Sequence, residues 1–207
     1  MARRSIENGQ WSELPVQSIE YMGETFKSFT EVRWAYVYQQ LGIRYLYEPQ
    51  LYEFIDGTRY KPDFYLPDLD CFVETKYDNL GMRALRKAVN LSRHTGKVVY
   101  IFDGFQIGKW QQDNSESAVK VDENTVRFKY RWCECPGCQK LGIEHKGDER
   151  LIQCSCPGKL NREMRTLPNQ ARIHDALTNA LSLSMLSVIE ANGKKFAVNR
   201  DPLEGER

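Results

Sequence analysis

The sequence predicts an α/β fold, in which helices pack against a β-sheet, and three observations predict it. Residues 28–41 are densely apolar and end before Gly42, as expected for a largely buried helix with a glycine stop. Short segments rich in aromatic and β-branched residues follow, which favours strands. Residues 80–93 then carry apolar side chains at helical spacing, and residues 98–102 are typical of a buried strand. A strand, a helix and a strand in this order predict a crossover with parallel pairing.

Four strand segments follow the first predicted helix. Asp56-Gly57 and Pro67-Asp68 supply turns between them, so the segments are predicted to form a mostly antiparallel meander. They comprise residues 43–47, 51–55, 59–66 and 71–76.

Three further stretches differ from this core pattern. Residues 1–25 lack clear periodicity and are expected to form an N-terminal arm. Residues 111–124 are polar and predict a loop. Residues 125–132 alternate apolar with basic side chains, the two-residue period of a half-buried strand. The apolar side chains expected on its inner face are Val126, Phe128, Tyr130 and Trp132.

Length and composition bound the domain organisation. The chain has 207 residues, of which 41% are hydrophobic, enough for one ordinary core and a smaller appendage. Residues 171–190 are amphipathic, as in a packing helix, and the tail from residue 199 is charged. We therefore expect an N-terminal arm at 1–25, a core at 26–124, a cysteine module at 125–165, and a C-terminal helix and tail at 166–207.

Hydropathy and charge exclude some classes of protein. No stretch approaches the roughly 18 to 20 uninterrupted apolar residues that a membrane helix needs, and the basic start of the chain has no apolar run behind it. We expect a soluble, cytoplasmic protein without a membrane partner. The net charge of +1 does not indicate a nucleic-acid partner by itself. The sequence leaves the oligomeric state open.

Positive charge gathers locally between Gly81 and Lys97, a stretch without acidic residues. On a helix these side chains could form a stripe that faces DNA phosphates. A solvated helix face explains them equally well. The candidate DNA-binding residues are Arg83, Arg86, Lys87 and Arg93.

The stretch from Tyr60 to Lys76 contains two carboxylates and a lysine that could share one catalytic site. Asp63 belongs to one predicted strand, and Glu74 and Lys76 lie two apart in the next, so both point to the same face of the sheet. Two carboxylates hold Mg²⁺, which polarises a phosphate and lowers the pKa of a bound water. A lysine offsets the negative charge of the attacking water or of the phosphate. This combination suits phosphodiester cleavage.

The residues Pro62-Asp63 and Glu74-Thr75-Lys76 resemble the two half-motifs of the PD-(D/E)xK nuclease superfamily. The resemblance covers roughly residues 26–102 and extends to small nucleases common in bacteriophages and bacteria. It implies a restriction-endonuclease-like core, with a helix, antiparallel strands, then a helix and a parallel strand. It also implies DNA as substrate, Mg²⁺ or Mn²⁺ as cofactor, and a cytoplasmic site of action, with a phage gene as one origin.

The resemblance also assigns roles to individual residues. It places Glu31 of the first helix at the catalytic site and gives Gln50 an accessory place there. The backbone carbonyl of Thr75 joins Asp63 and Glu74 as a metal ligand. A plainer explanation stays open for each: Ser28 and Glu31 fit a helix capping box, Pro62-Asp63 fits a strand edge, and Glu74 with Lys76 fits a surface pair.

Five of the six cysteines lie between Cys133 and Cys156. In an intracellular chain such a cluster indicates a metal site rather than disulfides. Zinc takes four ligands in a tetrahedron, and the expected role is structural. A disulfide, an unliganded cluster and an iron–sulfur cluster remain alternatives. The expected ligands are Cys135, Cys138, Cys154 and Cys156, with Cys133 as a spare or alternative ligand.

These features lead to two function hypotheses. The first is a metal-dependent DNA endonuclease that hydrolyses phosphodiester bonds through Asp63, Glu74 and Lys76. The alternative is a non-catalytic DNA-binding or assembly protein that uses a nuclease-like scaffold and the zinc module. The sequence does not separate endonuclease from exonuclease action, and it names no preferred DNA structure.

Overall fold

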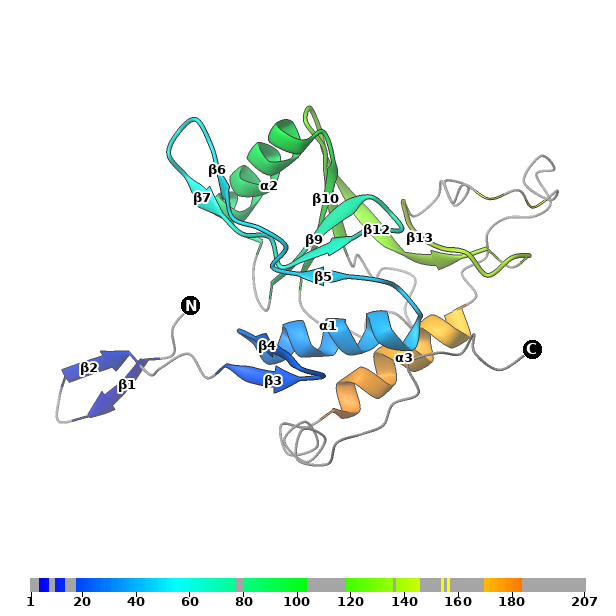
Figure 1. Ribbon diagram of the computed structural model, residues 1–207, viewed down its shortest axis with the longest axis horizontal. Coiled ribbons are helices and arrows are strands. Elements are labelled where there is room, and N and C mark those ends of the chain that lie inside the picture. The colour runs from blue at the N-terminus through cyan, green and yellow to red at the C-terminus, as the bar shows by residue number, and fades with distance from the viewer. Residues whose placement is uncertain are drawn as a thin grey trace.

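A seven-stranded sheet and three helices make up most of the described structure, a mixed α/β fold (Figure 1). The structure is a computed structural model, and it describes residues 4–7, 10–13, 18–76, 80–103, 118–135, 137–145, 154, 156 and 170–183. The predicted α/β class is therefore confirmed. The expected helix of 171–190 is described only to residue 183, and the charged tail lies outside the described residues.

The sheet has the order β13-β12-β11-β10-β9-β8-β5. Its pair β9–β10 is parallel, and every other neighbouring pair is antiparallel. The strands are β5 (Leu46–Tyr47), β8 (Phe64–Leu66), β9 (Cys71–Lys76), β10 (Val98–Asp103), β11 (Ala118–Val121), β12 (Val126–Glu134) and β13 (Leu141–His145).

The first helix, α1 (Phe29–Gln40), starts with a capping box. The Ser28 side chain accepts a hydrogen bond from the Glu31 amide, and the Glu31 side chain accepts one from the Ser28 amide. Two of the amide donors at the helix start are thereby satisfied. After the C-cap Leu41, Gly42 takes a φ of +68°, a conformation that glycine adopts without steric cost.

The second helix, α2 (Met82–Thr95), connects β9 to the parallel strand β10. Its apolar side includes Ala88 and Leu91, which are fully buried. The strand–helix–strand unit predicted from the spacing of apolar residues is present in the structure.

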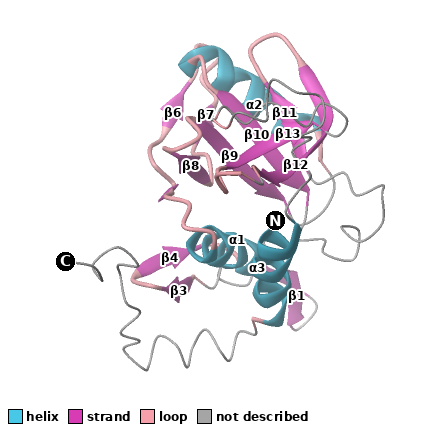
Figure 2. Cartoon of the chain, turned by 90° about the vertical axis from the view of Figure 1, so that its right-hand side faces the viewer, coloured by secondary structure: helices cyan, strands magenta, loops and turns pink. Residues whose placement is uncertain are grey.

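The helices cover opposite faces of the sheet (Figure 1). The helices α1 and α3 (Gln170–Ser182) pack side by side under one face and form the larger core with Trp34, Phe64 and Trp132 (Figure 2). On the other face, α2 packs with Phe72 and Ile101 in a second core. None of the described helices is long and apolar enough to cross a membrane.

The N-terminal region contains short strands that the sequence did not predict. It contains two hairpins, β1 (Arg4–Glu7) with β2 (Gln10–Glu13) and β3 (Ile19–Tyr21) with β4 (Glu24–Phe26). Ile19, Tyr21 and Phe26 are buried in the larger core. The sequence did not reveal these strands because strands of three and four residues are too short to show a period.

Two loop and strand predictions also need correction. The predicted segment 59–66 is divided: β7 (Arg59–Tyr60) pairs with β6 (Tyr52–Glu53) in a separate two-stranded sheet, whereas β8 joins the main sheet and pairs antiparallel with β5 and β9, as expected. The predicted loop at 111–124 contains β11. Polar residues surround this short strand, whose Ala118, Val119 and Val121 are nevertheless buried between two neighbours in the sheet.

The strand β12 keeps the predicted alternation only in its second half. Tyr130 and Trp132 are buried, but Val126 and Phe128 are 40% and 51% exposed, which contradicts their predicted inward side. The reason is an irregular pairing with β11, whose register shifts there, and a φ of +71° at Lys129. A bulge of this kind re-aims the side chains before it.

Candidate active site and cysteine cluster

The carboxylate of Asp63 is fixed by the neighbouring strand. Asp63 immediately precedes β8, which pairs with β9. Its Oδ2 accepts a hydrogen bond from the Thr75 amide at 2.7 Å and another from the Thr75 hydroxyl at 3.0 Å. The middle residue of the Glu-Thr-Lys sequence thus holds Asp63 through both its backbone and its side chain.

Glu74 of β9 is buried, and both of its oxygens have partners. Lys76 pairs with Oε1, in agreement with the shared face predicted for these two residues. The buried Tyr60 hydroxyl donates to Oε2. Burial, followed by the charge of Glu74, raises the pKa of Tyr60 well above its ordinary value, so this phenol stays a donor.

Glu31 reaches the same region from α1. Its Oε2 accepts bonds from the amides of Lys27 at 2.9 Å and Ser28 at 3.1 Å, and from the Tyr47 hydroxyl at 2.7 Å. The capping role of Glu31 is therefore present. All three bonds end on Oε2, so within the described residues they leave Oε1 for another partner.

The pKa of Asp63 is raised by its burial and by the negative charges of neighbouring carboxylates. Burial, followed by the charge of Glu74, raises this pKa well above its ordinary value, and Glu31 adds to the effect. The Lys76 ammonium and the Thr75 amide oppose it without cancelling it. An ionised Asp63 is therefore costly here unless a further cation approaches.

The pKa of Lys76 is affected by three carboxylates, those of Glu74, Asp63 and Glu31. Burial alone would lower the pKa of its ammonium, but the charges of Glu74, Asp63 and Glu31 outweigh burial and raise it. Lys76 is therefore cationic at neutral pH. The hydrogen bonds from Thr75 to Asp63 and from Lys76 to Glu74 bring three of the predicted catalytic residues together at the start of β8 and the end of β9. The charge of the fourth, Glu31 of α1, acts on Asp63 and Lys76. We call these four residues the acidic cluster.

The carboxylate oxygens of the acidic cluster are spaced more widely than the ligand atoms of a closed metal site. Among the described residues, the one group of three or more Cys, His, Asp or Glu ligand atoms within 4.8 Å of one another consists of cysteines.

Gln50, the predicted accessory residue, lies exposed in the loop between β5 and β6. No described hydrogen bond joins Gln50 to the acidic cluster.

The predicted DNA-binding residues lie on α2, which begins after the strand that ends at Lys76. Arg83 and Arg86 are exposed. The Lys87 ammonium lies 5.4 Å from the centre of the Tyr60 ring, which ties α2 to the acidic cluster. Arg93 is exposed, and its Nε donates to the Glu123 carbonyl at 3.0 Å, toward the β11–β12 turn.

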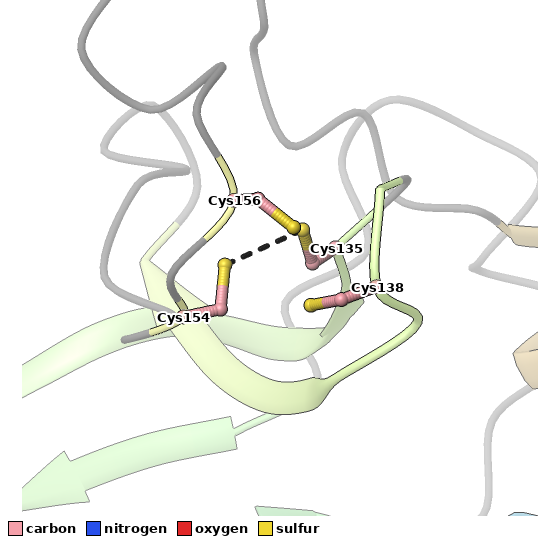
Figure 3. A group of neighbouring side chains, drawn as sticks. All are labelled: Cys135, Cys138, Cys154 and Cys156. Atoms are coloured by element: carbon pink, nitrogen blue, oxygen red, sulfur yellow. Dashed lines mark hydrogen bonds between the residues drawn. The ribbon is translucent and has the colours of Figure 1, made fainter.

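Four cysteines form a second site at the far end of the sheet (Figure 3). Cys135 and Cys138 follow β12, and their sulfurs lie within 4.8 Å of those of Cys154 and Cys156. The Sγ atoms of Cys135 and Cys154 are 3.5 Å apart, well beyond a disulfide bond of about 2.05 Å and near the roughly 3.8 Å edge of a tetrahedral Zn–thiolate site. These four cysteines could hold a metal ion such as zinc, and they are the four chosen from the sequence.

The turn between Cys135 and Cys138 is shaped for this cluster. Burial would raise the pKa of the Cys135 thiol, but the amides of Cys138 and Gly137 donate to its sulfur and lower the pKa to about 7. A Cβ atom placed on Gly137 would lie 3.0 Å from the Cys156 sulfur. A larger residue here would push the Cys156 sulfur by a few tenths of an ångström. Cys133, the spare in the sequence-based choice, is fully buried outside the group of four.

The cysteine site is joined to the helical layer by Arg172 of α3. This guanidinium lies 3.1 Å from the buried Glu134 carboxylate and donates to the Gln139 carbonyl at 3.3 Å. Glu134 and Gln139 flank the Cys135–Cys138 turn. The strands on either side of this turn, β12 and β13, also belong to the main sheet, since β12 pairs with β11 and β13.

Sequence reasoning did not identify several residues that hold the acidic cluster. Tyr60, Tyr47 and Lys27 each donate to one of its carboxylates. The only local signal was proximity, because Tyr60 stands three residues before Asp63 and Lys27 stands beside the helix cap. Comparisons with protein-family models, with curated proteins and with solved structures found no match to this chain.

Proposed function

We propose that the protein is a metal-dependent nuclease that hydrolyses phosphodiester bonds in DNA at the acidic cluster. The observation that carries the proposal is the meeting of Asp63, Glu74 and Lys76 at the β8–β9 pair. The charge of Glu31 on α1 acts on Asp63 and Lys76 as well. The sequence α1, antiparallel β8–β9, α2 and parallel β10 is also the order expected of a restriction-endonuclease-like core, and we propose that core as the finer fold.

The donor set suits a hard divalent cation such as Mg²⁺ or Mn²⁺. Asp63 and Glu74 offer carboxylate oxygens, and the backbone of Thr75, the residue after Glu74, offers a carbonyl, all ligands that such ions prefer. The raised pKa of Asp63 supports this fit, since a cation would relieve the repulsion from Glu74. When bound, the ion would polarise the phosphate and lower the pKa of a water.

The side chains of the acidic cluster have distinct tasks in this reaction. Lys76, cationic at neutral pH, offsets negative charge that builds on the phosphate. Tyr60 holds Glu74 through its hydroxyl, and Thr75 holds Asp63. One water is consumed: its oxygen bonds to phosphorus, the ester P–O bond breaks, and the leaving oxygen takes up a proton.

One observation favours a second function. Both Glu74 oxygens are already bonded by Lys76 and Tyr60, and these bonds satisfy the carboxylate without a metal ion. On this basis the alternative is a non-catalytic DNA-binding or assembly protein with the same scaffold. The two functions differ in whether bound DNA is cut.

The test is a cleavage assay with linear, nicked, branched and single-stranded DNA in the presence of Mg²⁺ or Mn²⁺. We expect cleavage by the wild type, and at least a hundredfold loss in Asp63→Asn and Lys76→Ala with DNA binding retained. This loss is the usual scale for removing a group that stabilises the transition state. Omitting the divalent cation should also abolish cleavage.

Asp70 and Lys97 provide matched controls. They form an exposed ion pair at the other end of β9, so Asp70→Asn and Lys97→Ala should cleave at the wild-type rate. DNA binding without cleavage of any substrate would favour the non-catalytic alternative. Full turnover in Asp63→Asn would refute the assigned site.

A further inference from the structure

Two lysines from distant parts of the sequence share one carboxylate beside the acidic cluster. Lys27 pairs with Oε1 of Glu48, and Lys61 lies 3.1 Å from Oε2 of the same residue. The Glu48 side chain is 17% exposed, whereas Lys27 and Lys61 are 60% and 38% exposed. The acceptor is thus held inward, and the two ammonium groups face solvent together.

Glu48 is fixed in place by its backbone. It lies just after β5, and its amide donates to the carbonyl of Asp63 at 2.8 Å. Its φ of +44° places it in the left-handed region, which residues other than glycine rarely adopt. Unfavourable backbone conformations of this kind persist where the surrounding structure enforces them, and they gather at functional sites.

Each lysine is also linked to one carboxylate of the acidic cluster. The Lys27 amide donates to Glu31 Oε2 at 2.9 Å and to the Tyr47 hydroxyl at 3.0 Å. Lys61 stands two residues before Asp63 in the chain. Both ammonium groups are held by Glu48, whose backbone is bonded to that of Asp63, and the Lys27 backbone is bonded to Glu31. The lysine pair therefore lies next to the acidic cluster.

The net charge of Lys27, Lys61 and Glu48 indicates what kind of molecule they bind. The Glu48 carboxylate accepts hydrogen bonds from both Lys27 and Lys61. Two ammonium groups against one carboxylate leave a positive charge. Three carboxylates in the adjacent cluster repel a polyanion, so a nucleic-acid strand entering the cluster needs cationic contacts at its rim.

We infer that Lys27 and Lys61, held by Glu48, bind a backbone phosphate of DNA next to the phosphate that is cut. This inference rests on the proposed function and adds a binding subsite to it. Backbone phosphates recur at every nucleotide, so a strand with one phosphate at the acidic cluster presents another nearby. The contact carries no sequence information, since phosphate contacts position a strand and base contacts specify it.

The test is DNA binding by the full chain as a function of salt. Asp63→Asn serves as the background, so that bound DNA is not cut. Each phosphate that the protein neutralises adds about 0.9 to the magnitude of the slope of log K against log salt. We expect Lys27→Ala and Lys61→Ala each to lower this slope, and the double variant to lower it by about 0.9, so that the affinity of the double variant falls about 3.5-fold less between 50 and 200 mM salt.

Control variants separate this contact from general charge. Arg44 pairs with Asp68 and Lys97 with Asp70, both at the β8–β9 turn and away from Asp63. Arg44→Ala and Lys97→Ala should keep the parental slope. Lys27→Gln and Lys61→Gln should reproduce the alanine results, because only the charge matters. A millimolar excess of free phosphate should compete only weakly, since a single phosphate lacks the rest of the strand.

The outcomes distinguish the inference from the proposed function. If the parent binds DNA but the lysine and control variants share its slope, the rim contact is wrong and the nuclease proposal stands. Weaker binding in the alanine variants but not in the glutamine variants would also overturn it. If the wild type neither binds nor cuts any DNA tested, both proposals fail. Full competition by free phosphate would indicate a small-anion site instead.

Discussion

Each carboxylate of the acidic cluster is held by a different set of donors. Thr75 donates to Asp63, Tyr60 and Lys76 donate to Glu74, and backbone amides with Tyr47 donate to Glu31. Most of these donors are neutral, so they orient the oxygens without cancelling their charge. Lys76 supplies the one cation within the cluster, which leaves its net charge negative and suited to a divalent ion.

Asp63→Asn should change how stability depends on pH. Burial and the Glu74 charge raise the folded-state pKa of Asp63 above its unfolded value of about 3.9. Between these two pKa values the folded state binds more protons, so the wild type loses roughly 1.4 kcal/mol per pH unit. Asparagine does not titrate. Urea unfolding without divalent cations, from pH 4 to 8, should show the variant gaining on the wild type as pH rises.

Asp68 offers a control of opposite sign. A hydrogen bond from Arg44 lowers the pKa of this exposed carboxyl in the folded state. Its contribution to stability is present above the unfolded pKa and is lost as pH falls, so Asp68→Asn should not gain on the wild type at high pH. A constant difference between Asp63→Asn and the wild type at every pH would contradict the raised pKa of Asp63.

At the scale of elements, the start of α1 joins helix formation to the candidate site. Glu31 completes the capping box with Ser28 and belongs to the acidic cluster as well. The sequence left these two roles as alternatives. The capping role is present, and it does not exclude the other, because the capping bond and the Tyr47 bond use Oε2 while the charge of the carboxylate still acts on Asp63 and Lys76.

Ser28→Ala should destabilise the protein by about 1 kcal/mol, the usual cost of removing an N-cap side chain. The Glu31 amide would lose its acceptor at 3.2 Å. Urea unfolding at neutral pH measures the difference. Ser28→Asp keeps an oxygen acceptor and should stay close to the wild type. Equal unfolding free energies for Ser28→Ala and the wild type would show that the cap contributes nothing.

Elements with strong local patterns were predictable, and those defined by their neighbours were not. The strand β9 has its predicted bounds, because its apolar run is continuous. The strand β11 has four residues within a polar stretch and exists through its pairing with β10 and β12. Phe128 follows an alternating pattern but is exposed, since the bulge at Lys129 breaks the pairing that would have directed it inward.

At the scale of the whole molecule, one sheet connects the two candidate sites. The acidic cluster involves β8 and β9, and the cysteine site follows β12. Arg172 joins the cysteine turn to α3, which packs on α1 and so on the helix that carries Glu31. A metal ion in the cysteine site would therefore stabilise the helical layer as well as the turn.

We expect elemental analysis to find about one zinc per chain, lost in both Cys138→Ser and Cys154→Ser. Three remaining ligands cannot complete the tetrahedron, and zinc contributes apparent binding energy on the order of 10 kcal/mol in small modules. Gly137→Ala should weaken binding, because its Cβ would meet the Cys156 sulfur. Hydrogen exchange in β12, β13 and α3 should rise in the metal-free variants.

Cys133→Ser is the matched control for the ligand set. Cys133 is buried but lies outside the group of four sulfurs, so this variant should keep its zinc. Loss of zinc from Cys133→Ser together with retention in Cys135→Ser would show that Cys133, two residues earlier, is the ligand in place of Cys135. A full zinc content in Cys138→Ser would reject the four-cysteine site.

The sequence by itself determined the features that depend on near neighbours along the chain. The capped helix α1, the β9–α2–β10 unit, the shared face of Glu74 and Lys76, and the four metal-binding candidates among the cysteines all follow from spacing. Spacing suffices there because helical and extended backbones repeat with fixed periods.

Only the tertiary structure decided which distant residues meet. It brought Glu31 to Asp63, placed Tyr60 on Glu74, and set Lys27 and Lys61 on the strained Glu48. It also joined β12 and β13 to the main sheet. Such contacts depend on strand order, register and the packing of α1 beneath the sheet. These are set by burial of the whole core, and no local stretch of sequence contains them.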